Sequence, residues 1–243
     1  MSKSCTPDKN NEQINTQQTE YSMPLIGAKA PEFCASTTNG PIKFPADFAN
    51  KWIVFFSHPS DFTPVCTSEF IAFQRDLTDF EHMNVQLVGL SIGALPSHLA
   101  WLDAISKMKG GIDITFPLID DMGGKIAQMY GMIHSNISDT HAVRAVFIID
   151  TQGIIRAILY YPATLGRNID EIKRMVVGLQ TGDAFKIATP ANWKPGDDIL
   201  QPAPMTAAAV RNAVNKHPWF MSYKRLDKDV IYRKIRKQKS EKK

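Results

Sequence analysis

The sequence KWIVFFSHPSDFTPVCTSE, residues 51–69, joins an apolar run to a segment with helical periodicity. Its first part, Lys51 to Ser57, is rich in β-branched and aromatic residues and predicts a buried strand. Pro64 suits the first turn of a helix because no backbone N–H donor is needed there, and Thr63 before it is a helix-capping residue type. Cys66 is therefore expected in the first turn of a helix that directly follows a strand.

Other runs along the chain have the composition of core strands or the periodicity of helices. The strand candidates are VQLVGLS (85–91), AVFIID (145–150) and IIRAILYY (154–161). The helical stripes are Phe70, Phe73, Leu77 and Phe80; Leu99, Leu102 and Ile105; and Ile169, Ile172, Val176 and Leu179. The short Thr-Gln-Gly turn between the last two strands predicts an antiparallel hairpin. This element order predicts an α/β layered fold with a mixed central sheet flanked by helices.

Composition and charge divide the chain into three expected parts. The 243 residues, 44% of them hydrophobic, are enough for a substantial core. Residues 1–22 form a polar leader without the apolar core of a signal peptide, and no run approaches the roughly 20 apolar residues of a membrane span. A cytoplasmic protein without membrane contact is therefore expected. The main domain is predicted over residues 23–182 and a C-terminal arm with a basic tail over residues 183–243.

The C-terminal arm combines proline, aromatic and basic residues. Residues 210–243 hold 12 Lys and Arg against 3 Asp and Glu, whereas the rest of the chain holds 16 against 21. Such a tail can contact nucleic acid or an anionic surface, but a solvated terminal helix explains the same residues and is favoured. The segment HPWFMSY (217–223) places aromatic surface beside this charge. An arm of this kind often wraps a second subunit, which predicts a homodimer.

The three cysteines, Cys5, Cys34 and Cys66, include no Cys-x-x-Cys pair, so neither a disulfide framework nor a cysteine-rich zinc site is indicated. Without a clustered set of His, Asp and Glu ligands, no metal or other cofactor is expected. In α/β folds reactive groups often follow the carboxyl ends of strands at helix N-termini, where a thiolate is stabilised. The position of Cys66 therefore indicates a cysteine that acts as a nucleophile.

A thiolate that attacks a peroxide needs donors and a fixed cation for the negative charge that develops on oxygen. Thr63 offers a hydroxyl three residues before Cys66. Arg144 is the leading candidate for the cation because it is the charged residue that enters the apolar run 145–150. A strand-end arginine that pairs with a surface carboxylate is an equally good interpretation of Arg144 at this point.

The segment PSDFTPVCTSE (59–69) resembles the Pro-x-x-x-Thr-x-x-Cys motif of the peroxiredoxins, with Pro59, Thr63 and Cys66 at the motif positions. Three more segments are similar to the one-cysteine, long-tailed class of that family: HLAW (98–101), RAVFIID (144–150) and YPATLGRNIDEI (161–172). The resemblance runs from about residue 25 to residue 204. It implies a thioredoxin-like fold and a thiol-dependent peroxidase of antioxidant defence that reduces hydrogen peroxide and organic hydroperoxides.

The resemblance also implies roles for individual residues. Cys66 would attack the peroxide and become a sulfenic acid, while Arg144 and Thr63 would hold the thiolate and the peroxide oxygens. Pro59 would shield the pocket. The supporting residues implied are His58, Glu69 and Arg167, of which the last two would orient Arg144.

The tail contains no cysteine that could resolve the sulfenic acid, and Cys5 and Cys34 are expected to be noncatalytic. The resulting hypothesis is a one-cysteine cycle completed by an external thiol, either a thioredoxin-like protein or a small thiol. The family implies at least a homodimer, assembled in some members into a decameric ring. Two alternatives stay open: a thioredoxin-like holdase chaperone or redox sensor, and a nucleic-acid-binding protein, which no groove-reading motif supports.

Overall fold

The computed structural model describes residues 23–213 and 218–240, and the chain forms two compact units. The first unit runs to Leu77 and continues with Val85–Arg167. The second contains Thr78–Asn84 and the chain from Asn168 onward. The predicted division of the chain at residues 22 and 182 stays a prediction.

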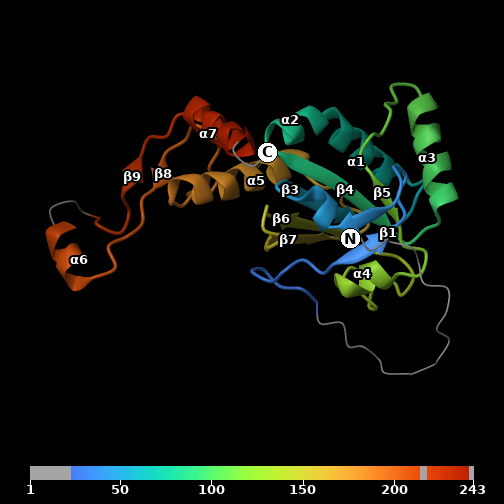
Figure 1. Cartoon of the computed structure of the whole chain (residues 1–243), viewed down its shortest axis with the longest axis horizontal. Coiled ribbons are helices and arrows are strands. Elements are labelled where there is room, and N and C mark those ends of the chain that lie inside the picture. The colour runs from blue at the N-terminus through green and yellow to red at the C-terminus, as the bar shows by residue number, and fades with distance from the viewer. Residues whose placement is uncertain (1–22, 214–217, 241–243) are drawn as a thin grey trace, which may run out of the picture. The chain divides into compact units, whose positions relative to one another are not determined.

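A five-stranded mixed sheet forms the centre of the first unit, in the order β5-β4-β3-β6-β7 (Figure 1). Its strands are β3 (Trp52–Ser57), β4 (Val85–Ser91), β5 (Leu118–Asp120), β6 (Arg144–Ile149) and β7 (Ile155–Tyr161). β4 is parallel to β3 and to β5, whereas β6 is antiparallel to β3 and to β7. The prediction of a mixed sheet that ends in a hairpin is therefore confirmed.

Aromatic residues of β3 explain why both faces of this sheet are covered. Successive side chains of a strand point to opposite faces, so Phe55 and Phe56 lie on different sides. The Phe55 ring packs 4.9 Å from both Phe44 and Tyr130, measured between ring centroids. The Phe56 ring stacks 4.3 Å from that of Phe73. The strand is buried along its whole length, which matches its continuous apolar sequence.

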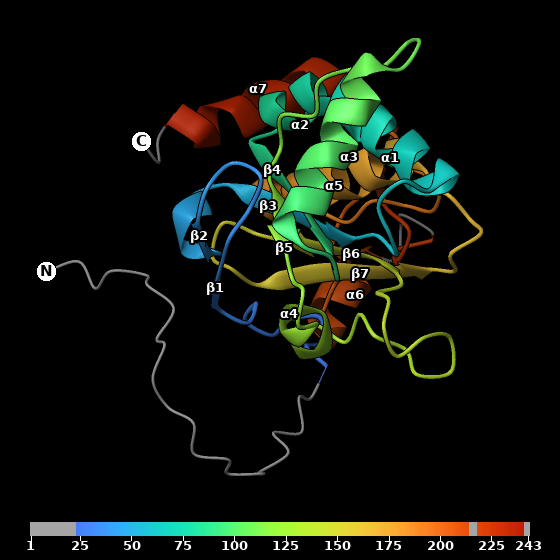
Figure 2. The same ribbon diagram turned by 90° about the vertical axis from the view of Figure 1, so that its right-hand side faces the viewer.

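Three helices and a small hairpin of the first unit surround this sheet. They are α1 (Pro64–Arg75), α3 (Leu95–Lys107), α4 (Lys125–Met129) and the antiparallel pair β1 (Phe33–Ala35) and β2 (Ile42–Phe44), which is followed by a 3-10 turn at Ala46–Phe48. Figure 2 shows α1 and α3 together on one side of the sheet and α4 on the other. Phe70 of α1 and Trp101 of α3 join the two helices, with ring centroids 4.7 Å apart.

The stripe Phe70, Phe73, Leu77 and Phe80 belongs to two helices rather than to one. Asp76 ends α1, and its backbone N–H donates to the carbonyl of Ala72. A second short helix, α2 (Leu77–His82), follows immediately. Apolar spacing alone predicted a continuous helix because the break at Asp76 does not disturb the periodicity of the buried side chains.

The second unit contains α5 (Ile169–Phe185), a two-stranded sheet of β8 (Ile199–Leu200) and β9 (Tyr223–Lys224), α6 (Ala207–Ala213) and α7 (Lys228–Ser240). α7 packs against α5 (Figure 1). Ile231 and Ile235, one helical turn apart on α7, are fully buried. The basic tail thus forms a helix with an anchored apolar face up to the limit of the described residues. None of the helices in the described part of the chain is long and apolar enough to cross a membrane.

Candidate active site

Cys66 lies where β3 passes into α1, as the sequence predicted. The residues between these elements form a tight turn in which Phe62 adopts a left-handed backbone conformation, with φ of 56°. Thr63 is the N-cap residue of α1 in an extended conformation, and Pro64 occupies the first turn. Cys66 is a free cysteine with 0% exposure, so its sulfur is held inside the first turn of the helix.

Arg144, the first residue of β6, places its guanidinium beside this sulfur. Its Nη1 atom donates to Cys66 Sγ at 3.3 Å and to Glu69 Oε2 at 2.7 Å. Its Nε and Nη2 atoms both donate to the carbonyl of Ala163, at 3.1 and 2.8 Å. The interpretation of Arg144 as a strand-end arginine with a surface carboxylate is wrong, because the side chains of Arg144 and Glu69 are only 3% and 2% exposed.

Glu69, one helical turn after Cys66, connects Arg144 to Arg167. Glu69 Oε1 accepts from Arg167 Nε at 2.9 Å and Oε2 accepts from Arg167 Nη2 at 2.7 Å. The other terminal nitrogen of Arg167 donates to the carbonyls of Ser57 and Ala145, which lie on β3 and β6. Burial lowers the pKa of Arg167 below its usual value, and the charge of Glu69 opposes this shift. Two buried guanidiniums therefore face one carboxylate, and a Cys66 thiolate would balance the remaining charge.

The hydroxyl of Thr63 does not cap its own helix. Its Oγ1 donates to the carbonyl of Ser60 at 2.9 Å, which leaves the lone pairs of the oxygen free to accept a hydrogen bond. Thr63 and Pro59 are both half-buried in the turn that precedes α1. Both motif residues thus lie in the turn that leads into the helix carrying Cys66.

Next to this turn, His58 forms part of a second buried polar cluster. Its Nε2 lies 3.0 Å from Asp61 Oδ1, while His98 Nδ1 and Ser97 Oγ each lie 2.7 Å from Asp61 Oδ2. An ionised carboxylate can only accept, so both imidazoles donate to Asp61. Burial lowers the pKa of His58, which keeps this imidazole neutral. His58 Nδ1 is buried and has no hydrogen-bond partner among the described residues.

Asp61 was not predicted from the sequence as part of the site, and no role was predicted for His98 or Trp101. Burial by itself raises the pKa of Asp61, but the hydrogen bonds from His58, His98 and Ser97 outweigh it and hold the pKa well below its usual value. Trp101 packs against His58 with ring centroids 4.9 Å apart and donates from Nε1 to Thr67 Oγ1. The signal was present, because Asp61 follows His58 by three residues, a spacing that suits a local carboxylate–imidazole contact.

Cys34 does not belong to this cluster. Cys34 is exposed on β1, and Cys5 lies outside the described residues. Their expected noncatalytic character stays a prediction. Within the described ranges, no group of three or more His, Cys, Asp or Glu residues is arranged to hold a metal ion.

Comparison with known proteins gives a consistent result over most of the chain. Residues 26–158 match the AhpC/TSA family, and residues 178–214 match the C-terminal domain of 1-Cys peroxiredoxin. A peroxiredoxin of Methanosarcina mazei is 50% identical over 215 residues, which cover 84% of this chain and 98% of the relative. Peroxiredoxin 2 of Caldanaerobacter subterraneus is 49% identical and covers 84% of this chain and 94% of its own length.

Solved structures show the same relationship. A yeast mitochondrial 1-Cys peroxiredoxin, studied for thiol resolution through glutathione and thioredoxin systems, superposes with a TM-score of 0.75 at 36% identity, covering 84% of this chain and all of that chain. Peroxiredoxin 6 of Arenicola marina gives a TM-score of 0.70 at 35% identity, covering 77% of this chain and 88% of that one. The predicted thioredoxin-like fold is thus confirmed. The chain belongs to the peroxiredoxins, the AhpC/TSA family of thiol-dependent peroxidases.

Proposed function

We propose that Cys66 is the peroxidatic cysteine of a one-cysteine peroxiredoxin that reduces hydrogen peroxide and organic hydroperoxides in antioxidant defence. The single observation that carries this assignment is the 3.3 Å contact between Arg144 Nη1 and Cys66 Sγ inside a buried site. A cation held against a buried sulfur favours the thiolate, which is the nucleophilic form.

The reaction begins when the Cys66 thiolate attacks the terminal oxygen of the peroxide. An S–O bond forms, the O–O bond breaks, and the alkoxide or hydroxide that leaves takes up a proton to become an alcohol or water. The sulfur is oxidised to a sulfenic acid. An external thiol then condenses with the sulfenic acid and releases water, and a second thiol reduces the mixed disulfide and returns Cys66 to its thiol form.

Each surrounding residue has a defined task in this scheme. Arg144 donates to the sulfur and, through the same guanidinium, to the peroxide oxygens as negative charge develops on them. Thr63 accepts the hydrogen of the peroxide O–H group. Glu69 and Arg167 keep the Arg144 guanidinium in place, and Pro59 shields the pocket from solvent. His58 supports the turn through its contact with Asp61.

Three observations support the one-cysteine form of the cycle. The match to the C-terminal domain of 1-Cys peroxiredoxin covers residues 178–214, and the yeast relative that superposes on the chain is itself a 1-Cys enzyme. The sequence after Cys66 contains no further cysteine. The yeast protein is resolved through glutathione and thioredoxin systems, so we propose a thioredoxin-like protein or a small thiol as the reductant here.

The assembly and location belong to the same proposal. The aromatic and basic arm after residue 182 supports a homodimer at minimum, with a decameric ring as the larger form, in the cytoplasm. Light scattering at micromolar concentration should give at least twice the monomer mass. A monomer under these conditions contradicts the dimer without affecting the chemistry at Cys66.

The one-cysteine cycle is tested with a Cys5→Ser/Cys34→Ser double variant. We expect it to turn over hydrogen peroxide at the wild-type rate when excess dithiothreitol is supplied. Peptide mapping of the wild type after one equivalent of peroxide should locate a sulfenic acid at Cys66. Loss of turnover in the double variant, together with a disulfide from Cys66 to either other cysteine, contradicts the proposal.

A further inference from the structure

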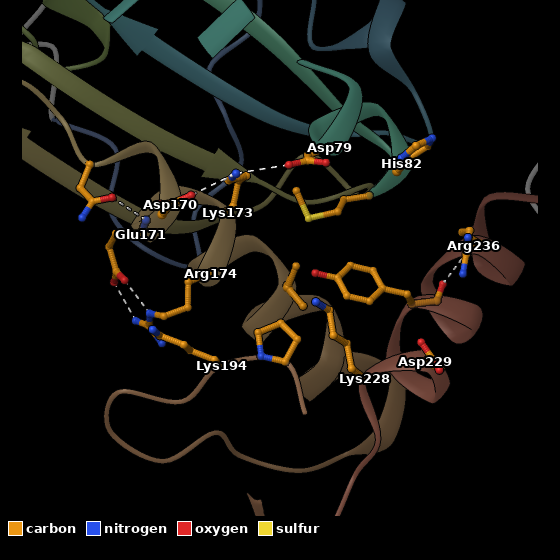
Figure 3. Close-up of a pocket in the computed structure, with 15 residues that line it drawn as sticks. Asp79, His82, Asp170, Glu171, Lys173, Arg174, Lys194, Lys228, Asp229 and Arg236 are labelled. Atoms are coloured by element: carbon orange, nitrogen blue, oxygen red, sulfur yellow. Dashed lines mark hydrogen bonds and ion pairs between the residues drawn. The ribbon is translucent and has the colours of Figure 1, made fainter. Parts of the chain in front are cut away.

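A cavity of about 900 Å³ lies within the second unit, and no residue of the Cys66 site lines it. Its walls come from α2, the first half of α5, Lys194 and Pro195 of the arm, and α7 (Figure 3). Small-molecule sites in proteins typically have volumes of about 300–1,000 Å³. The cavity is therefore large enough for a ligand, and its charges indicate which kind.

Ion pairs neutralise one part of the lining. Lys173 Nζ lies 3.3 Å from Asp79 Oδ2 and 3.1 Å from Asp170 Oδ1. Arg174 forms a two-pronged contact with Glu171, in which Nη2 lies 2.7 Å from Oε1. With two carboxylates on one ammonium, the wall around Lys173 is the acidic side of the cavity.

Three other cations of the lining have no carboxylate partner in the described part of the chain. Among the described residues, no carboxylate lies within salt-bridge distance of Lys194, Lys228 or Arg236. Arg236 Nε donates to the carbonyl of Tyr232 at 3.2 Å. The terminal nitrogens of Arg236 donate to no carboxylate among the described residues. Asp229 is the lining carboxylate that remains outside the ion pairs. Among the described lining residues, three cations thus stand outside the ion pairs against one such carboxylate.

An aromatic ring, that of Tyr232, lines the cavity beside Lys228. Figure 3 shows Lys228 pointing from α7 toward α5, and Tyr232 is on the same face of α7 one turn later. The Lys228 ammonium lies 5.9 Å from the centre of the Tyr232 ring. Met83, Val177 and Pro195 contribute apolar surface to the same cavity. A planar group could pack here while its polar ends reach the charged walls.

We propose that this cavity binds a phosphorylated small molecule of nucleotide size. The phosphates would bind to Lys194 and Lys228, the planar group would pack against Tyr232, and hydroxyl or amino donors would reach the carboxylates of Asp79 and Asp170. The site is independent of the chemistry at Cys66, because its residues belong to the second unit and none contacts the thiol.

The helix that carries Lys228 and Tyr232 is held by apolar contacts of its own. Ile231 and Ile235 are buried and anchor α7, so the orientation of Lys228 and Tyr232 does not depend on a ligand to order the helix. A site that is already formed loses less conformational entropy on binding.

The test is isothermal titration calorimetry of ADP into the full-length protein at low ionic strength, with adenosine and inorganic pyrophosphate as comparison probes. The test variant is Lys194→Gln/Lys228→Gln. The matched control is Arg233→Gln/Lys234→Gln, which removes the same charge from exposed positions of α7 that do not line the cavity. Cys66→Ser serves as a second control because it abolishes the proposed peroxidase reaction without touching the cavity.

We expect ADP to bind more tightly than adenosine, and the test variant to bind ADP more weakly by about tenfold for each lysine removed, the loss expected for a charge-assisted hydrogen bond. The control variant and Cys66→Ser should bind like the wild type, and the test variant should keep wild-type peroxidase activity. Equal affinity for adenosine and ADP, an equal loss in the control variant, or no binding at millimolar ADP and pyrophosphate would each overturn the proposal.

Discussion

The Nη1 atom of Arg144 lies 3.3 Å from the Sγ atom of Cys66, although 78 residues separate them in the sequence. The antiparallel pairing of β6 with β3 brings the two residues together, because Arg144 begins β6 and Cys66 follows the end of β3. The guanidinium is fixed by Glu69 and by the carbonyl of Ala163 before any substrate arrives. A donor fixed in advance needs no reorganisation when charge develops on a peroxide oxygen.

Arg144→Lys tests this arrangement. Lysine keeps the positive charge but has a single nitrogen, which cannot take the positions of the three guanidinium nitrogens that contact the sulfur, Glu69 and Ala163. We expect the second-order rate constant for oxidation by hydrogen peroxide, measured by stopped-flow fluorescence, to fall by about 10² to 10³. Arg156→Lys is the matched control, since Arg156 pairs with Asp150 on another part of the sheet and its side chain is 25% exposed. A rate within about twofold of wild type in Arg144→Lys contradicts the role given to the guanidinium.

Glu69→Gln tests the electrostatic balance of the buried cluster. The substitution leaves Arg144 and Arg167 buried without the carboxylate that they share, and breaking a buried pair in this way costs about 3–5 kcal/mol of unfolding free energy. Glu171→Gln removes a carboxylate from the half-exposed pair with Arg174 and should cost less than about 1 kcal/mol. Urea unfolding of both variants provides the comparison. Equal losses would mean that the network around Glu69 does not contribute to stability as its burial indicates.

Thr63→Val removes a hydroxyl and keeps the branched shape of the side chain. Because Thr63 Oγ1 donates to Ser60, it can only accept from the peroxide, and we expect the peroxide rate constant to fall about 10²-fold without it. Thr63→Ser should restore most of the rate. If the valine and serine variants react equally fast while their melting temperatures match that of the wild type, the hydroxyl does not contact the substrate.

The pH dependence of stability should reveal the neutral His58. The folded protein holds the pKa of this buried imidazole below 6.5. As the pH falls, His58 is therefore protonated in the unfolded chain at a pH where it is still neutral in the folded chain. The contribution of His58 to the unfolding free energy should therefore have its full value above about pH 6.5, and the unfolding free energy should decrease below that pH. His58→Gln should show a smaller decrease between about pH 7.5 and about pH 5.5 in urea unfolding. Identical slopes for wild type and variant would contradict this account of His58.

Four strands of the central sheet, β3, β4, β6 and β7, were predictable because each is a short run of β-branched and aromatic residues. The Thr-Gln-Gly turn at 151–153 correctly predicted the antiparallel hairpin of β6 and β7. The three-residue strands β1, β2 and β5 were not predicted, because segments this short carry no measurable periodicity. The five-residue helix α4 was missed for the same reason. The break at Asp76 was missed because the spacing of apolar residues does not show where one helix ends and the next begins.

The site was predictable in its residue types but not in its connections. The motif supplied Cys66 and Thr63, and the apolar surroundings of Arg144 marked it as unusual. The contact of Glu69 with Arg167 spans 98 residues, and no local pattern predicts such a pairing. Asp61 was missed because aspartate in a turn with prolines and serine is ordinarily a turn former, and only the fold brings His98 to its second oxygen.

The most direct test of the central claim is the rate at which Cys66 is oxidised by a sub-stoichiometric pulse of hydrogen peroxide in competition with excess free thiol. Wild type and Cys66→Ser are quenched and analysed by intact mass and peptide mapping. The account predicts that Cys66 of the wild type is oxidised within a second despite the competing thiol, as the sulfenic acid or as its mixed disulfide with that thiol, and that residue 66 of Cys66→Ser carries neither modification. Oxidation of Cys66 no faster than that of the competing thiol would contradict it, because the Arg144 contact would then give the sulfur no advantage toward peroxide.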